Sequence, residues 1–254
     1  MQNSFVTDAI NLKSYNLSEA DKIIVMYSKE KGLIRGVAKG VKKPKSKLGA
    51  RMDLLVANTL MLHKGRNLDT ICQAEVVNSF YKTRQDIDKI CYSTYVTEVV
   101  HNFGIEEDPC SEIIYNLLYQ TLNTISSAET KVDILLAVIK FQLKMMIESG
   151  FSIELEQCLC CHHELKEETM FFVPQMGGIV CENCATHIHH NKKQIPHKLR
   201  DFFKQMSLTD FDKKGEYETK ANEKVCMVTF EALKEYIAIK SPKKFKSTNI
   251  LQCY

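Results

Sequence analysis

Two pairs of cysteines place the strongest constraint on how this chain can fold. Cys158 and Cys161 form the first pair, Cys181 and Cys184 form the second, and nineteen residues separate the pairs. A C-x2-C turn lets two thiolates face one ion, and two such turns complete the tetrahedral set of sulfur ligands found in structural zinc sites. The spacing therefore predicts one structural zinc ion held by these four cysteines.

Other interpretations of the same segment stay open from the residues alone. The thiols are either reduced and simply buried, or one pair is a redox-active C-x2-C, although a redox pair needs no second pair. A Cys158–Cys160 pair would leave a one-residue spacer, so we expect Cys160 to be a spare thiol. We expect His187, His189 and His190 to belong to a polar surface loop and not to the ligand set.

Cysteine usage also bears on the compartment. No apolar stretch approaches the roughly 20 residues that a membrane span needs, and the first residues lack the layout of a signal peptide. We therefore expect a cytoplasmic protein, in which clustered cysteines favour metal over disulfides. The five other cysteines are scattered, and we expect each to pack as a small hydrophobic side chain: Cys72, Cys91, Cys110, Cys226 and Cys253.

The first 80 residues have the pattern of short strands separated by turns. Apolar runs at residues 23–27 and 33–38 predict one hairpin, and those at 54–62 and 68–76 predict a second. Together with residues 5–12 they make about five strands, which suits a small closed barrel.

From about residue 86 the hydrophobic period changes to three and four residues, which is typical of helices. Helices are predicted over residues 87–103, from residue 111 onward, and over 133–149, 196–206 and 222–240. The cysteine pairs fall between the third and fourth of these helices. The metal site is therefore predicted to be an insert, at about residues 155–190, in a helical domain over residues 81–254.

Net charge is only +3, but the charges are unevenly distributed. Residues 1–80 hold 13 Lys and Arg against 7 Asp and Glu, and the nine basic residues from Lys29 to Arg51 face one acid, Glu30. A basic loop on a barrel can neutralise phosphates without reading sequence, while bases of a single strand stack on aromatic residues such as Tyr15 or Tyr27. The predicted DNA-contacting residues are Arg35, Lys39, Lys42, Lys43, Lys45, Lys47, Arg51, Lys64 and Arg66. A solvated lysine-rich loop without a ligand is the alternative.

Three other functions compete with DNA binding by the barrel. A zinc-ribbon transcription or RNA-binding factor would share the basic barrel and the cysteines but would prefer one sequence or RNA. A pure adaptor would be held on DNA only by its partners. An enzyme lacks support, because the chain has no paired acidic metal motif, glycine-rich phosphate loop or nucleophile signature. Glu19 and Asp21 are expected to be cap and turn residues.

Taken in order, these segments resemble the RecO family of bacterial recombination mediators along nearly the whole chain. The N-terminal matches are Ala9, Ile10, Leu12, Tyr15, the run from Glu19 to Ile23, the basic segment within residues 32–47 and the turn at residues 64–68. The later matches are Tyr95, Glu98, Gly150, Phe151, Gly177, Gly178 and the four paired cysteines. Asn11 departs from the family pattern, because that position is usually apolar.

The resemblance implies an α+β protein: an N-terminal OB-fold β-barrel over residues 1–80 and a helical domain with an inserted four-cysteine zinc finger. It implies binding of single- and double-stranded DNA, annealing of complementary strands, and no catalytic centre. Its implied partners are RecR, the C-terminal tail of single-strand-binding protein and, indirectly, RecA, at the bacterial nucleoid. Lys131, Lys140 and Lys144 are candidate cations for that acidic tail.

Overall fold

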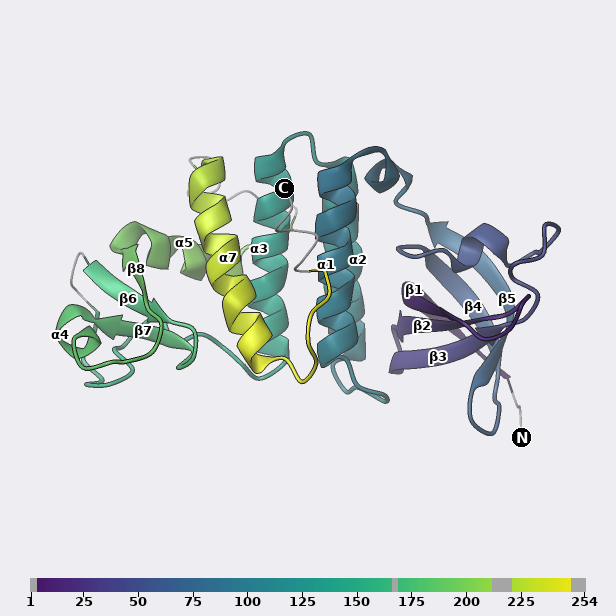
Figure 1. The fold of residues 1–254 in the computed structure, drawn as a ribbon, viewed down its shortest axis with the longest axis horizontal. Coiled ribbons are helices and arrows are strands. Elements are labelled where there is room, and N and C mark those ends of the chain that lie inside the picture. Colours follow the sequence, from purple (N-terminus) through teal and green to yellow (C-terminus); the bar gives the residue numbers. More distant parts are fainter. Residues whose placement is uncertain (1–3, 166–168, 212–220, 248–254) are drawn as a thin grey trace. The chain divides into compact units, whose positions relative to one another are not determined.

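The structure, a computed structural model, describes residues 4–165, 169–211 and 221–247 (Figure 1). The chain divides into two compact units. The first unit comprises Met1–Ser127 together with the end of the chain from Lys246, and the second comprises Ala128–Phe245. Within the described ranges, no helix is both long enough and apolar enough to cross a membrane.

Five strands of the first unit close into a barrel. They are hydrogen-bonded in the order β1-β2-β3-β5-β4, and β4 closes the barrel against β1. The pair β3–β5 is parallel and the other pairs are antiparallel. This is a five-stranded barrel of OB type. The strands are β1 (Ser4–Asn16), β2 (Lys22–Ser28), β3 (Gly32–Ala38), β4 (Ala57–His63) and β5 (Asp69–Asn78).

Alternating apolar side chains fill the barrel. Ile24 and Met26 of β2 and Leu60 of β4 have no exposed surface. Gly36 allows β5 to cross close to β3, because a Cβ atom at this position would lie 2.8 Å from Cγ1 of Ile71. Packing inside the barrel therefore explains both the alternation of apolar residues and the glycine in β3.

The basic loop (residues 39–53) follows β3 and is attached to the barrel by its own apolar residues. Val41, Leu48 and Met52 join the barrel core. A 3-10 helix, η1 (Gly49–Met52), lies near the end of the loop. Because these anchors are spread along the loop, its backbone follows the barrel surface while its lysines remain exposed.

Two buried asparagines hold the end of the basic loop. Nδ2 of Asn11 in β1 donates to the carbonyl oxygens of Arg51 and Asp53, both at 2.8 Å. Nδ2 of Asn58 in β4 donates to the same Arg51 oxygen at 2.9 Å. The polar residue at the usually apolar position 11 therefore positions the loop.

The start of the basic loop is tied to the β1–β2 turn. The carboxylate of Asp21 accepts the Gly40 N–H at 2.7 Å, and the carbonyl of Ala20 accepts the Lys42 N–H at 3.0 Å. Asp21 is thus a turn residue, as predicted. Both ends of the basic loop are held by hydrogen bonds to the barrel.

Two helices of the first unit, α1 (Ile87–Phe103) and α2 (Ser111–Ser127), follow a short 3-10 helix, η2 (Tyr81–Gln85), and pack on the outside of the barrel. Val25 and Tyr27 on the outer face of β2 are buried. The Tyr27 hydroxyl donates to Asp108 in the α1–α2 connection at 2.9 Å. Burial and this hydrogen bond raise the pKa of Tyr27 above its usual range. The prediction that Tyr27 stacks on DNA bases is therefore wrong, because the helices cover it.

The second unit is built on the pair α3 (Lys131–Glu148) and α7 (Glu223–Lys240), with α5 (His197–Leu208) against α3. A capping box starts α3: Thr130 and Asp133 each accept the other's backbone N–H. Between α3 and α5 lies a three-stranded antiparallel sheet in the order β7-β6-β8, with one turn of helix in the connection between β7 and β8. Its elements are β6 (Thr169–Val173), β7 (Gly178–Cys181), α4 (Glu182–Ala185) and β8 (Lys193–Pro196).

The α+β class, the OB-type barrel and the five helices predicted from hydrophobic period are confirmed. The second hairpin begins at Ala57 and not at residue 54, because Leu55 adopts a positive φ of 64° that interrupts the strand. Cys91 and Cys226 are buried as expected, Cys110 is half-buried, and Cys253 lies outside the described residues. The expectation for Cys72 is wrong, because its side chain is exposed on β5.

Replacing Asn11 with leucine tests whether the asparagine anchor stabilises the barrel. The carbonyl of Asp53 would lose its Nδ2 donor, whereas that of Arg51 would keep the one from Asn58. We expect Asn11→Leu to lower the free energy of unfolding by about 1–2 kcal/mol in a urea titration. Asn16→Leu, at an exposed position of the same strand, should change it by less than about 0.5 kcal/mol. Equal stabilities of the two variants would contradict the role given to Asn11.

Candidate metal centre and nucleic-acid interface

The two cysteine pairs are carried by two tight turns of the second unit. The first lies in a small hairpin, where the Cys158 N–H donates to the carbonyl of His163 and the His162 N–H donates to the carbonyl of Cys158, both at 2.9 Å. In the second, Cys181 ends β7 and Cys184 lies in the short helix α4. Each turn therefore presents two sulfurs on one side.

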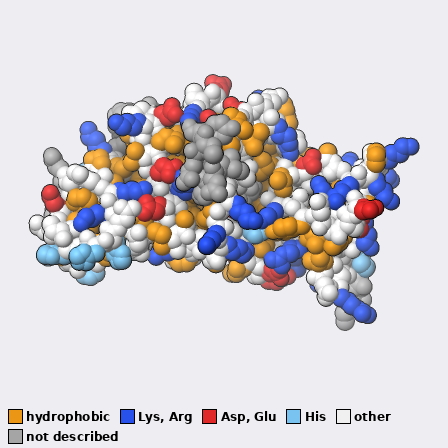
Figure 2. Space-filling model, viewed as in Figure 1, with side chains coloured by type: hydrophobic (Ala, Val, Ile, Leu, Met, Phe, Trp, Pro, Cys, Tyr) orange, Lys and Arg blue, Asp and Glu red, His pale blue; other side chains and the backbone are white. Residues whose placement is uncertain are grey.

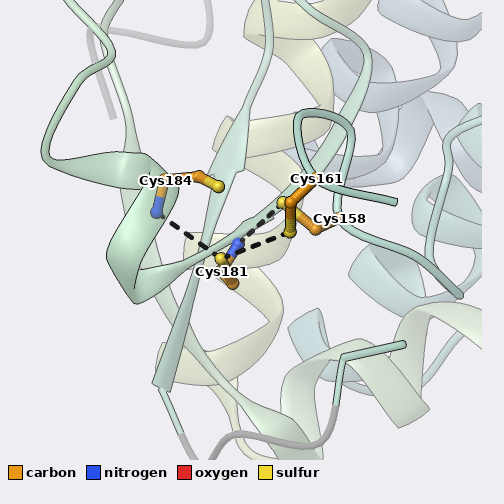
Figure 3. A group of neighbouring side chains, drawn as sticks. All are labelled: Cys158, Cys161, Cys181 and Cys184. Carbon is orange, nitrogen blue, oxygen red and sulfur yellow. Dashed lines mark hydrogen bonds between the residues drawn. The ribbon is translucent and has the colours of Figure 1, made fainter. Parts of the chain in front are cut away.

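The four sulfurs converge on one point (Figure 3). All of them lie within 4.8 Å of one another, and Sγ of Cys161 is 3.9 Å from Sγ of Cys181. Zinc–sulfur bonds of about 2.3 Å in a tetrahedron put sulfurs about 3.8 Å apart. The four cysteines can therefore hold one metal ion, as the spacing predicted.

Backbone amides donate to two of these sulfurs and favour the thiolate form of Cys158. The Cys181 N–H donates to Sγ of Cys158 at 3.4 Å, and the Cys184 N–H donates to Sγ of Cys181 at 3.5 Å. Burial alone raises the pKa of Cys158, but the amides around it outweigh burial and lower the pKa to about 6. Hydrogen bonding to the neighbouring thiol of Cys181 raises the pKa of Cys184. A metal ion that binds here displaces the remaining thiol protons, because the thiolate and not the thiol is the ligand.

Cys160 and the histidines stay outside this cluster. Cys160 is exposed between the two members of the first pair, and the metal-binding group found in the described residues does not contain it. His187, His189 and His190 are exposed, as expected for a surface loop. The convergence of both pairs favours a metal site over a single redox pair.

The nine basic residues predicted to contact DNA are all exposed, but they fall into two groups. Strand pairing places the β1–β2 turn and the basic loop at one end of the barrel, and the β2–β3 and β4–β5 turns at the other. The basic loop carries Lys39, Lys42, Lys43, Lys45, Lys47 and Arg51, whereas Arg35, Lys64 and Arg66 lie toward the opposite end. The barrel therefore does not bring all nine together.

Acidic residues pair with only one cation of the second group. Arg35 pairs with Glu106, and the neighbouring Lys31 pairs with Glu107, both at 3.0 Å. These four residues line a cavity of 260 Å³ together with Lys64 and Asp69. Lys64 and Arg66 are exposed and are in no ion pair among the described residues.

The cations of the basic loop have far fewer partners. Among the described residues, the side chains of Lys39, Lys43, Lys45 and Lys47 form no ion pair or hydrogen bond. Lys42 Nζ donates to the Ser18 carbonyl at 2.9 Å, and Arg51 donates to the Lys47 carbonyl. Figure 2 shows Lys and Arg side chains at the loop tips of the barrel.

Asn11, Asn58 and Asp21 position the basic loop, a role that was not predicted from the sequence. The only available signal was a polar residue within an otherwise apolar strand, at Asn11. Its partners Arg51 and Asp53 are 40 and 42 residues away, so the contact is not visible in local sequence.

Together these features define an OB-barrel protein with a cationic loop and a four-cysteine metal-binding finger. Residues 1–80 match the family described as "Recombination protein O N terminal", and residues 84–249 match "Recombination protein O C terminal". The chain belongs to the recombination protein O, or RecO, family.

Curated relatives agree with this assignment. The chain is 36% identical over 180 residues to the DNA repair protein RecO of Desulforamulus reducens, covering 71% of this chain and 68% of that one. It is 31% identical over 219 residues to that of Shouchella clausii, covering 85% and 82%. It is 28% identical over 246 residues to that of Symbiobacterium thermophilum, covering 96% and 95%.

Serine substitutions test the ligand assignment. Cys184→Ser should reduce the metal content of dialysed protein from about one ion per chain to near zero, because three thiolates leave the site open. Cys160→Ser should retain the ion, since this thiol lies outside the cluster. The measurement is elemental mass spectrometry on both variants. A full complement of metal in Cys184→Ser would contradict the assignment.

Proposed function

We propose that this protein is a DNA-binding recombination mediator in DNA repair, with no catalytic centre of its own. It binds single- and double-stranded DNA and anneals complementary strands. With RecR it helps to load RecA onto gaps covered by single-strand-binding protein. Membership of the RecO family and the curated relatives named as DNA repair proteins support this role.

The observation that carries the proposal is the set of free lysines on an anchored loop. Lys43, Lys45 and Lys47 are exposed and form no ion pair within the described residues, while the loop backbone is bonded to the barrel at both ends. Neutralising phosphates releases counterions, which supplies affinity that does not depend on base sequence. Annealing then needs only that two strands lose their mutual repulsion, and no bond is made or broken by the protein.

We further propose that the metal is one structural Zn²⁺ bound by Cys158, Cys161, Cys181 and Cys184. Four thiolates satisfy tetrahedral zinc and leave no open position for a substrate. The ion would stabilise the finger at about residues 155–190 in the helical domain over residues 81–254, while residues 1–80 form the DNA-binding domain. The protein would act in the cytoplasm, at the nucleoid.

Cations of the second unit are proposed to receive the acidic tail of single-strand-binding protein. Lys131 and Lys144 are half-buried, and Lys131 pairs with Glu223 at 3.4 Å. Lys140 is buried and donates to the carbonyl of Asp210, so it is withdrawn as a candidate for an exposed rim. An exposed carboxylate partner such as Glu223 can be exchanged for the tail.

The test is a salt titration of binding to one single-stranded oligonucleotide by wild type and by Lys43→Gln/Lys45→Gln/Lys47→Gln. Loss of three phosphate contacts should flatten the plot of log affinity against log salt by about 2, since each contact contributes about 0.7. The affinities should then differ about a hundredfold near 0.1 M salt and converge near 1 M. Lys42 is left unchanged because it also bonds to Ser18.

The control for this experiment removes the same charge elsewhere. Lys198→Gln/Lys224→Gln/Lys244→Gln changes three exposed lysines of the second unit and should keep the wild-type slope. Equal slopes in all three proteins would reject the basic loop as the DNA site. A strong preference for RNA or for one sequence would favour the alternative of a zinc-ribbon transcription or RNA-binding factor.

A further inference from the structure

A groove of 710 Å³ lies alongside the basic loop on the barrel. Lys47 and Arg51 of the basic loop line it, together with residues of β1, β4 and β5. Its volume falls in the range of about 300–1,000 Å³ in which protein pockets enclose small organic groups. The groove is thus large enough for one or two bases of a nucleic acid.

The strand β5, which lines the groove, is only briefly paired with β3. In the described barrel the two strands share the pairs Gly36↔Asp69 and Val37↔Thr70, and β5 then continues along β4 alone. The basic loop runs past this part of β5, as the contacts between β5 and η1 indicate. On β2, in contrast, Val25 and Tyr27 of the outer face are buried under the helices of the first unit. That face of the barrel is therefore closed to ligands.

The chemistry of the groove combines positive charge with exposed apolar surface. The Lys47 ammonium is exposed and unpaired among the described residues, and Arg51 bonds only to a backbone carbonyl. Val6 is 63% exposed and Val76 is 44% exposed in the lining. One acid, Glu75, also lines the groove. Such a surface suits a chain that carries phosphates on one side and apolar ring faces on the other.

A single-stranded nucleic acid fits this description, and a duplex does not. In a duplex the ring faces of the bases are stacked on one another, so a protein reaches the phosphates and the base edges but not the ring faces. In a single strand the ring faces are free to lie on apolar side chains while the backbone follows a cationic groove. The apolar lining would therefore contribute to binding of single strands alone.

We propose that this groove is the path of single-stranded DNA on the barrel. Phosphates lie along Lys47 and Arg51, and bases lie on Val6 and Val76. The inference rests on the proposed function, since it assigns the place where the DNA bound by the basic loop continues. No aromatic residue lines the groove, so binding should show little preference among bases.

Neighbouring valines of β5 provide a matched test. Val76 lines the groove, whereas Val77, 49% exposed, does not. Val76→Glu should weaken binding of a single strand about tenfold, because a carboxylate would repel the phosphates and the apolar contact with a base would be lost. Its affinity for a duplex should stay within about twofold of wild type, and Val77→Glu should leave both affinities unchanged.

A second substitution, expected to strengthen binding, distinguishes a lost DNA contact from local misfolding. Glu75→Gln removes the one acid of the groove and should strengthen binding of the single strand several-fold without strengthening duplex binding. No change in single-strand affinity in both Val76→Glu and Glu75→Gln would overturn the proposal. Equal effects on single strand and duplex would also overturn it, because they would reflect net charge alone.

A native thiol reports on occupancy of the groove directly. Cys72 is exposed and lines the groove, whereas Cys160 is exposed on the finger of the second unit. Adding single-stranded oligonucleotide to the metal-loaded protein should slow alkylation of Cys72 by iodoacetamide and leave Cys160 at its original rate, as read by peptide mass spectrometry. Unchanged alkylation of Cys72 at saturating DNA would overturn the proposal.

The experiments distinguish a failure of the proposed DNA binding by the basic loop from a failure of the proposed DNA path in the groove. If the triple substitution of Lys43, Lys45 and Lys47 weakens binding while Cys72 remains unprotected, the proposed function stands and the groove does not take DNA. If the triple substitution has no effect and Cys72 remains unprotected, both fall. Protection of Cys72 by an acidic protein segment, without protection by DNA, would assign the groove to a protein partner.

Discussion

The hydrogen bonds from Asn11 and Asn58 to the end of the basic loop are the interactions on which the functional surface depends. The two asparagine side chains take the place of apolar side chains in the barrel wall. They donate hydrogen bonds to backbone carbonyls of the loop that would otherwise lack a donor. Because the backbone of the loop is already ordered, binding a polyanion does not require ordering it again, and this preserves affinity. The lysine side chains keep their rotamer freedom, which suits contacts with a uniform phosphate backbone.

Some cations of the barrel are paired with acids, and others are in no ion pair. Arg35 and Lys31 pair with Glu106 and Glu107 of the α1–α2 connection, whereas the lysines of the basic loop, and Lys64 and Arg66 of the β4–β5 turn, are in no ion pair within the described residues. Exposed ion pairs contribute little to stability, so this arrangement matters more for where a polyanion can bind. The helices that bury Tyr27 also close one face of the barrel, and the open surface beside β5 remains.

The four-cysteine cluster bears on the stability of the finger and not on the charge of the barrel. The strands β6, β7 and β8 have only four or five residues each, too few to bury a core that would hold them alone. A metal ion that joins the hairpin of Cys158 to the end of β7 contributes folding free energy directly. The basic residues of the proposed DNA contacts lie in the other unit, so a metal ion bound by the cysteines would stabilise the finger and take no direct part in the proposed DNA binding.

Local patterns in the sequence predicted what depends on local chemistry. The C-x2-C spacing identified the four sulfurs, and hydrophobic period identified α1, α3 and α7, because ligand turns and helices are decided within a few residues. Features that depend on distant contacts were missed: the burial of Tyr27 depends on Asp108, and the role of Asn11 depends on Arg51 and Asp53. The short strands of the finger were missed because four apolar residues do not distinguish a strand from a buried loop.

Amide hydrogen exchange in the presence and absence of a saturating single-stranded oligonucleotide tests the central claim most directly, because it reports on every part of the chain at once. We expect slower exchange within residues 39–53 and 71–77 when DNA is bound, and no change within the finger at residues 158–185. Protection confined to residues 128–245, with the basic loop exchanging at its original rate, would contradict it.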